Sequence, residues 1–435
     1  DWMPRQKTAL VLLGHRWQYE FFLPLRLAGY RLQFLVPNDI DGYQAALDAI
    51  DKKTIDAVAM FNPYMKSHAA LRPFFELARR DGLKTIVVER GALPESWYYA
   101  DDVSYNDPEW SWDSIERAGL SAVELDIAAE YANRLKSGSF TLEAMGAMTE
   151  TLSRYAVYAR LHPQICFVPL QLDDDMAVTQ YTEGYQSYAD FAASLAEQIA
   201  KHPDVLFLIK QHPLSKVPLA LSGHNVLQCT SDDNVHGLLE TAGAVICYNS
   251  GVGMLALIHG KRLVTVGNAF YNLPGLGQRA RDVEQALELA FRGKEPVSSA
   301  EMTKFVAWLL FRKYSFFKAE SVIKEFAVRK SHNYKNLRFY RFNYGSTRIS
   351  HLRASVSAPF DFSSFASGVL GVQIRPVASK PAKPKSATLP AAAAPVPGTF
   401  ERKFRKLVRD PARFLVDSSH EPLRWLGSTF NKQKS

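Results

Sequence analysis

Short apolar runs rich in β-branched residues alternate with amphipathic segments along much of this chain, and this rhythm constrains the fold more than any other feature. In the first third, strands are predicted over 8–14, 30–36, 55–60 and 84–88. Helical segments are predicted between them, near 18–28, 43–52 and 68–81. Strands that alternate with helices indicate a parallel sheet covered by helices.

The same rhythm starts again after a helical region over about 114–160. Further strands are predicted over 165–172, 205–209, 225–229, 244–248 and 262–266, with a helix over 185–201. Two such repeats predict an α/β fold of two Rossmann-like domains with a central cleft. The segments 281–292 and 300–330 are expected to be helical and to pack back across both halves.

The composition is that of a soluble globular protein, with 47% hydrophobic and 22% charged residues. Cys166 and Cys247 lie inside apolar strand-like runs and Cys229 stands alone, which favours buried thiols in a reducing compartment over disulfides or a zinc site. No apolar run reaches the 18 or so residues that cross a bilayer, and the first residues show no signal-peptide core. A cytoplasmic protein is therefore expected.

The net charge of +8 is concentrated at the C-terminal end. Residues 400–435 hold nine Lys or Arg and four Asp or Glu, and they follow a Pro/Ala-rich stretch that is typical of an extended linker. Within residues 400–409 the apolar side chains share one helical face and the cations occupy the rest. This pattern predicts a segment that binds an anionic membrane surface; a helix docked on the protein itself or on a partner is the alternative. Nucleic-acid binding is disfavoured because the charge does not lie along a folded face.

Polar residues follow four of the predicted strands at the end where ligands gather in open α/β sheets. They are Glu89-Arg90-Gly91, Asp173-Asp174-Asp175, Lys210-Gln211-His212-Pro213 and Asn249-Ser250-Gly251-Val252-Gly253. All four are expected to face the same cleft.

Three consecutive aspartates are costly unless a cation compensates them, because like charges at short range raise one another's pKa. One interpretation is a divalent metal site. A second is a carboxylate nucleophile or base in sugar transfer, paired with Glu89 from the other half. A solvated turn that caps the next helix is the third, and the spacing does not separate them.

The other two motifs are suited to phosphate. Gly251 and Gly253 permit close backbone approach at the start of an apolar helix, although Ser250 as a simple helix cap explains them equally well. Lys210 and His212 could neutralise a leaving phosphate, and the alternative for His212 is a hydrogen bond within its own turn.

These segments, in this order, resemble the capsule polysaccharide biosynthesis proteins. The resemblance runs over about residues 84–277, through Glu89-Arg-Gly, Gln171-Leu-Asp-Asp-Asp175, Lys210-Gln-His-Pro and Asn249-Ser-Gly to Gly267-Asn-Ala-Phe-Tyr-Asn-Leu-Pro-Gly275. That family includes retaining β-Kdo transferases that act on capsule glycolipids or O-antigen chains. The resemblance implies a GT-B-like fold with CMP-β-Kdo as donor, and a glycan or lipid-linked glycan as acceptor.

The resemblance also implies roles for single residues. Asp175 is expected to be the nucleophile that forms a covalent sugar intermediate, although the choice among Asp173 to Asp175 is open, and Glu89 the acid/base. His212 with Lys210 would stabilise the phosphate of CMP. Substrate contacts are expected from Gln171, Asp173, Arg90, Asn249, Ser250 and Gly251. Because CMP carries a single phosphate, we expect no essential metal and no cofactor.

We therefore expect five segments. These are an N-terminal Rossmann-like domain on the acceptor side (1–160), a C-terminal Rossmann-like domain on the donor side (161–335), an extension packed on the core (336–371), a linker (372–399) and a membrane-association segment (400–435). The expected location is the cytoplasmic face of the inner membrane. The alternatives are a GT-B-like transferase or epimerase for another nucleotide sugar, or an inactive scaffold of a polysaccharide assembly complex.

Overall fold

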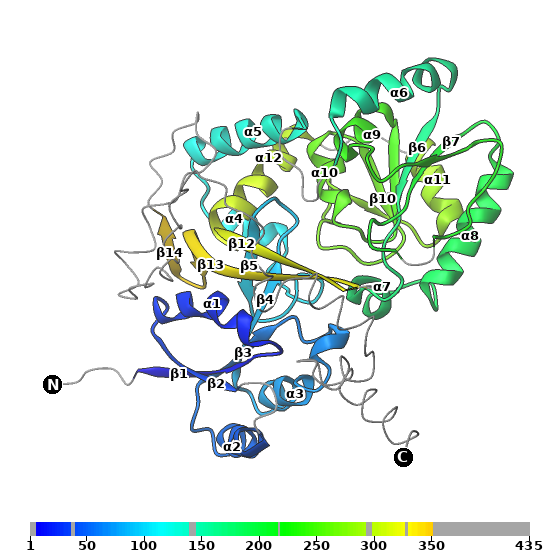
Figure 1. Ribbon diagram of the computed structural model, residues 1–435. Helices are drawn as coiled ribbons and strands as arrows, with labels where there is room; N and C mark the ends of the chain where they lie inside the picture. The colour runs from blue at the N-terminus through cyan, green and yellow to red at the C-terminus, as the bar shows by residue number, and fades with distance from the viewer. Residues whose placement is uncertain are drawn as a thin grey trace, which may run out of the picture. The chain divides into compact units, whose positions relative to one another are not determined.

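The computed structural model describes residues 6–35, 40–138, 145–215, 218–292, 298–326 and 329–350. Two β-sheets with helices on their faces make up this part of the chain (Figure 1). It belongs to one compact unit, Asp1–Ile374; the second, Arg375–Ser435, lies outside the described residues. The predicted linker (372–399) and membrane-association segment (400–435) lie outside them as well. No described helix has the length and apolar character that a membrane span requires.

The first sheet has eight strands, in the order β14-β13-β12-β5-β4-β3-β1-β2. Its four parallel strands are β1 (Lys7–Leu12), β2 (Tyr30–Leu35), β3 (Ala57–Phe61) and β4 (Lys84–Arg90). Strand β3 is buried at every position, as expected of a parallel strand that helices cover on both faces. The strands predicted over 8–14, 30–36, 55–60 and 84–88 are therefore confirmed, and all four end at the same edge.

Helices cover both faces of these parallel strands. The helices are α1 (Tyr19–Phe22), α2 (Ile40–Asp51) and α3 (Arg72–Arg80). Ala9 and Val11 pack in one core cluster with residues of α1, whereas Leu10 and Leu12 pack in another with residues of α2 and α3. This division follows from the two-residue period of a strand, which sends alternate side chains to opposite faces.

The rest of the first sheet is antiparallel, which the sequence did not predict. These strands are β5 (Ser96–Ala100), β12 (Tyr314–Phe326), β13 (Arg329–Tyr344) and β14 (Thr347–Ser350). The helix expected over 300–330 is wrong beyond its first part: α12 (Ser299–Trp308) is followed by a π-helical turn over Leu309–Lys313 and then by β12. Strand β12 pairs along most of its length with β13, and its first residues pair with β5, more than 200 residues earlier in the chain.

The second sheet has six strands, and every pairing in it is parallel. In spatial order they are β11 (Gln278–Arg279), β10 (Arg262–Thr265), β9 (Ala244–Cys247), β6 (Ile165–Pro169), β7 (Leu206–Lys210) and β8 (Val226–Cys229). The predicted second repeat is confirmed. The three cysteines are free and buried, as expected from their positions in or beside these strands.

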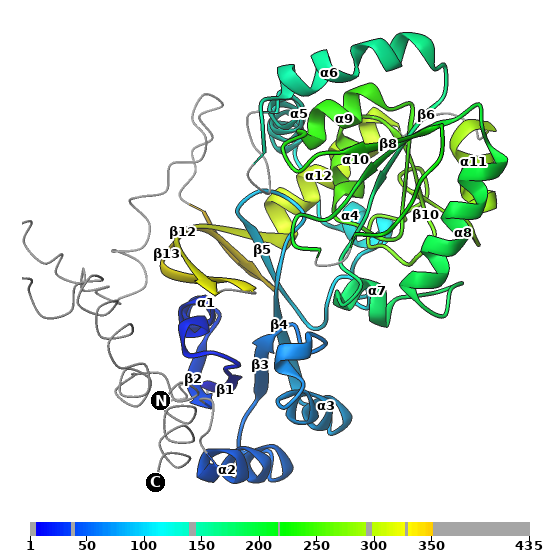
Figure 2. The same ribbon diagram turned by 45° about the vertical axis from the view of Figure 1, so that its right-hand side comes forward.

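Helices cover both faces of the second sheet as well (Figure 2). Side chains of α8 (Tyr188–Lys201) and α11 (Val283–Arg292) share one core cluster, and side chains of α9 (Val235–Thr241) and α10 (Val252–Ile258) share another. The remaining helices are α4 (Trp112–Arg117), α5 (Ala122–Lys136), α6 (Met148–Leu161) and α7 (Met176–Gln180). The cluster that includes α9 and α10 also contains Tyr98 and Trp110 from the first half, so the core is continuous between the two sheets.

Candidate active site

Aromatic residues of the first half contact the loops that follow strands of the second. The hydroxyl of Tyr105 donates to the carbonyl oxygen of Asn249 at 3.2 Å. Its ring stacks on Tyr181 with centroids 4.7 Å apart, and the indole N–H of Trp112 donates to the carbonyl of Pro274 at 2.8 Å. These contacts hold the carboxyl end of β9, where Asn249 lies, against the first half, so polar groups from both halves share one site.

Glu89 lies near the carboxyl end of β4 and carries an unusually basic carboxyl group. Its Oε1 accepts the N–H of Arg90 at 2.9 Å, whereas Oε2 is buried and has no hydrogen-bond partner within the described residues. The pKa of Glu89 is raised to about 7, first by burial and then by the charge of Asp175, against the lowering effects of Arg90 and the Asn62 side chain. A carboxyl with this pKa is suited to proton transfer near neutral pH.

Asp175 comes from the second half and begins α7 as its N-cap residue. Its Oδ1 accepts the N–H of Ala177 at 2.8 Å. The side chain is accessible to solvent, yet the surrounding protein desolvates it enough to raise its pKa, and Asp174 raises it further. The N–H of Ala177 and the charge of His212 act in the opposite direction. Asp175 thus interacts electrostatically with Glu89 and with His212.

Gln171 and Asn249, both predicted to bind substrate, are hydrogen-bonded to each other. The amide of Gln171 donates to Oδ1 of Asn249 at 3.0 Å and accepts the backbone N–H of Asn249 at 3.1 Å. Asn249 is fully buried, and its own amide donates to the carbonyl of Ala177 at 2.8 Å. Both side chains therefore hold the ends of β6 and β9 and the start of α7 together, which positions Asp175. Asn249 was predicted to contact the substrate, but its side-chain oxygen and nitrogen both have hydrogen-bond partners within the protein.

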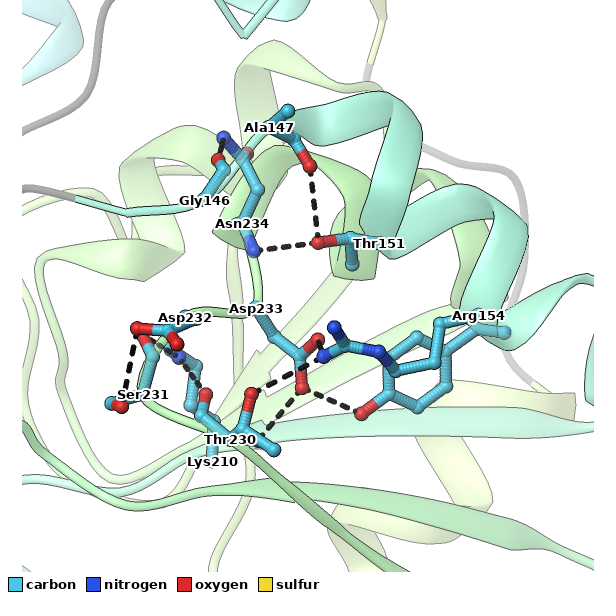
Figure 3. Close-up of polar contacts among 11 residues, drawn as sticks. Gly146, Ala147, Thr151, Arg154, Lys210, Thr230, Ser231, Asp232, Asp233 and Asn234 are labelled. Atoms are coloured by element: carbon cyan, nitrogen blue, oxygen red, sulfur yellow. Dashed lines mark hydrogen bonds and ion pairs between the residues drawn. The ribbon is translucent and has the colours of Figure 1, made fainter.

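The two predicted phosphate cations differ in what they contact. The Nδ1 atom of His212 accepts the N–H of Leu214 at 3.2 Å, which in the neutral ring leaves the proton on Nε2. The ammonium of Lys210 instead donates to the carbonyls of Thr230 and Ser231 at 2.7 and 3.2 Å (Figure 3). Two of the three donors of Lys210 therefore anchor the loop after β8.

The loop that Lys210 anchors is built around the fully buried Asp233. Its carboxylate pairs with Arg154 and accepts the hydroxyl of Tyr155 at 2.8 Å and the N–H of Thr230 at 2.7 Å. Figure 3 shows these contacts joining the middle of α6 to the loop after β8. Sequence reasoning missed this network because its members lie far apart in the chain.

Ser250 and Gly251 precede the short helix α10. Ser250 Oγ accepts the N–H of Val252 at 3.2 Å, and its carbonyl accepts the hydroxyl of Tyr271 at 2.5 Å. Gly251 is the N-cap residue, with space around the position that a Cβ would take. At Gly253 a Cβ would overlap the Tyr271 hydroxyl. Ser250 is therefore not the N-cap residue, although its Oγ accepts the first N–H of the helix, and Gly253 is required for packing.

Arg90, Asp173 and Asp174 complete the predicted set and are all exposed. Arg90 contributes its backbone N–H to Glu89, and Asp174 acts on Asp175 through its charge. Among the described residues there is no group of three or more His, Cys, Asp or Glu side chains arranged to hold a metal ion.

Two residues at this site were not predicted. Tyr105 has a raised pKa, first from burial and then from the charges of Asp175 and Glu89, so it lies near both carboxyls. It follows β5, a strand that the sequence analysis did not find. Asn62 directly follows β3 and is buried. The rule that polar residues at strand ends carry function would have found Asn62, had it been applied to every strand.

The comparisons with known proteins agree with this architecture. Residues 129–317 match the family described as "Capsule polysaccharide biosynthesis protein". Over this segment the chain is similar to that family. A curated relative, Protein FixF of Sinorhizobium fredii, is 31% identical over 139 residues, which is 31% of this chain. The match spans only 35% of that relative.

Solved structures extend the likeness to a larger share of the chain. The β-Kdo 2,4-transferase of KpsC from Thermosulfurimonas dismutans is similar over 76% of this chain and 96% of its own, with 14% identity and a TM-score of 0.50. The β-Kdo 2,7-transferase of the same KpsC is similar over 75% of this chain and 96% of its own, with 15% identity and a TM-score of 0.48. The expected GT-B-like fold is thereby confirmed.

Proposed function

We propose that this protein is a retaining glycosyltransferase that moves Kdo from CMP-β-Kdo to a glycan or lipid-linked glycan in capsule or O-antigen synthesis. The observation that carries the proposal is that Glu89 and Asp175, which come from opposite halves, interact electrostatically at adjoining strand ends. The capsule polysaccharide family match supports the pathway. The similar fold of the β-Kdo 2,4-transferase of KpsC supports the choice of sugar.

In the first step, a carboxylate oxygen of Asp175 attacks the anomeric carbon of Kdo. The bond from that carbon to the phosphate oxygen breaks, and CMP leaves with the bonding electron pair. His212, beside Asp175, and the N–H groups at the start of α10 would stabilise the charge that develops on the phosphate. The product of this step is a sugar esterified to Asp175.

In the second step, the acceptor hydroxyl attacks the same anomeric carbon from the opposite side to Asp175. The ester bond breaks and restores the Asp175 carboxylate, and the hydroxyl proton passes to Glu89. Two successive displacements retain the anomeric configuration. Glu89 is suited to this role because its pKa of about 7 lets it accept a proton at neutral pH.

CMP carries a single phosphate, so protein groups can balance its charge without a divalent metal. We propose His212 and the α10 turn around Ser250 for this task, with Lys210 indirectly holding the adjoining loop. Activity that survives chelation with EDTA would agree with this assignment, and activity restored only by an added metal ion would contradict it.

The direct test supplies the protein with CMP-Kdo generated in situ and a set of oligosaccharide and lipid-linked acceptors. We expect CMP release and a product with retained configuration. Calorimetric titration should show that CMP binds in preference to UDP or GDP. Absence of transfer with every acceptor, together with a preference for another nucleotide, would contradict the proposal and would favour a different nucleotide sugar.

A further inference from the structure

A buried polar network connects Glu89 to the turn that follows β1. It begins at Asn62, which lies directly after β3, the neighbour of β4. The backbone N–H of Asn62 donates to the carbonyl of Val88 at 3.1 Å, one residue before Glu89. Its Oδ1 accepts the N–H of Tyr64 at 2.9 Å. The amide is therefore oriented so that its nitrogen, the donor end, remains for the Glu89 carboxyl, on which it acts as a hydrogen-bond donor.

His68 fixes Asn62 from the other side. Nδ1 of His68 lies 2.9 Å from the carbonyl oxygen of Asn62, and because a carbonyl can only accept, Nδ1 must carry the proton. Nε2 is then the acceptor, and it takes its hydrogen bond from the Gln18 amide at 3.2 Å. His68 is almost completely buried, and burial lowers its pKa, helped by the charge of His15. A second proton on the ring would place two donors face to face, so His68 stays neutral.

Gln18 extends the network to the backbone. Its Oε1 accepts the N–H of Gly14 at 2.9 Å and that of His15 at 3.1 Å. Gly14 approaches the His68 ring so closely that a Cβ at this position would overlap it. The turn after β1, the His68 ring and Asn62 are thus packed as well as hydrogen-bonded to one another.

We infer that Asn62 and His68 are positioning residues for Glu89, holding its carboxyl and the turn after β1 as one rigid unit. The inference rests on the proposed acid/base role of Glu89 and deepens it. Buried networks of this kind are rigid only when their members have partners. The backbone N–H, the backbone carbonyl and Oδ1 of Asn62 each have one here. A donor at Asn62 also limits how far burial can raise the basicity of Glu89.

The test measures the titration of Glu89 directly, by NMR of protein labelled with ¹³C at the Glu side-chain carboxyl, with E89Q used to assign the signal. Groups that also act on Glu89 are Asp175, Arg90, Tyr98 and Tyr105, and they stay unchanged in every variant. N62A should shift the titration upward by roughly 1 pH unit, because it removes a donor to the carboxylate. The rising, acidic limb of the rate profile should shift with it in an active protein.

Two variants of nearly equal size separate positioning from packing at His68. H68N keeps a donor close to the place of Nδ1, whereas H68L removes it. We expect H68N to titrate like the wild type at Glu89 and H68L to shift toward N62A. If H68L does not fold, the Glu89 titrations of H68N and N62A are compared instead.

A Glu89 titration that is the same in N62A, H68L and the wild type would overturn the inference. The NMR measurement needs no substrate, so this result is distinct from failure of the proposed function, which would appear as a wild-type protein that releases no CMP.

Discussion

At the scale of single residues, the clearest prediction concerns how the transfer rate depends on the ionisation of Glu89. Glu89 is the base of the proposed second step only when ionised, so the rate of transfer should rise with pH through about 7. E89Q should abolish transfer to acceptors while CMP binding persists. A pH–rate profile of the wild type and calorimetry of E89Q with CMP check both points. Near-wild-type transfer by E89Q would remove Glu89 from the mechanism.

The same carboxyl affects stability in a predictable direction. Its pKa is raised from 4.5 to about 7 in the folded protein, so the folded state binds the proton more tightly than the unfolded state. Its contribution is complete below pH 4.5 and is lost as pH rises to about 7, at no more than roughly 1.4 kcal/mol per pH unit. Denaturant unfolding at several pH values should show a weaker decline in E89Q over this window.

At Asp175, one substitution can remove the proposed nucleophile and still keep the helix cap. D175N should abolish transfer, because an amide does not form the sugar ester. Its Oδ1 can still accept the N–H of Ala177, so α7 should keep its cap. D175A also loses the cap and should cost about 1 kcal/mol of stability. Transfer assays and thermal unfolding compare the two variants, and substantial turnover by D175N would assign the nucleophile elsewhere.

At the scale of elements, the start of α10 offers a matched pair of glycines. In G253A the new methyl group would displace the Tyr271 hydroxyl from the carbonyl of Ser250, so we expect a loss of about 1 to 3 kcal/mol. In G251A nothing lies within 4 Å of the methyl group and φ is −57°, so stability should change little. Equal unfolding midpoints for the two variants would contradict this account.

The elements that could be predicted are those whose local hydrophobic pattern alone specifies a strand or a helix. Strands such as β3 and β9 are buried at every position, and they appear in the sequence as continuous apolar runs. Strand β5 was missed and β12 was taken for a helix, because their aromatic residues fit either structure. Pairing decides the outcome: β5 pairs with the start of β12, more than 200 residues away, and the rest of β12 pairs with β13.

At the scale of the whole molecule, the C-terminal segment makes a prediction of its own. Deletion of residues 395–435 removes a cluster of Lys and Arg together with apolar residues, so it should release the protein from anionic liposomes. Transfer to soluble acceptors should be unchanged. Sedimentation with vesicles that contain anionic lipid, with neutral vesicles as control, measures this. Equal sedimentation of the full chain and the truncated chain would remove the membrane proposal.

The sequence by itself determined the two α/β repeats and the residues at the ends of their strands, because both follow from local periodicity. Only the tertiary structure decided which of their polar groups are hydrogen-bonded within the protein. It binds the amide of Asn249 to Gln171, 78 residues away, and the ammonium of Lys210 to the loop after β8, while it leaves an oxygen of Glu89 without a partner among the described residues. Hydrogen bonds between distant segments leave no periodic trace in a sequence, and they separate the groups available for chemistry from those that hold the site in place.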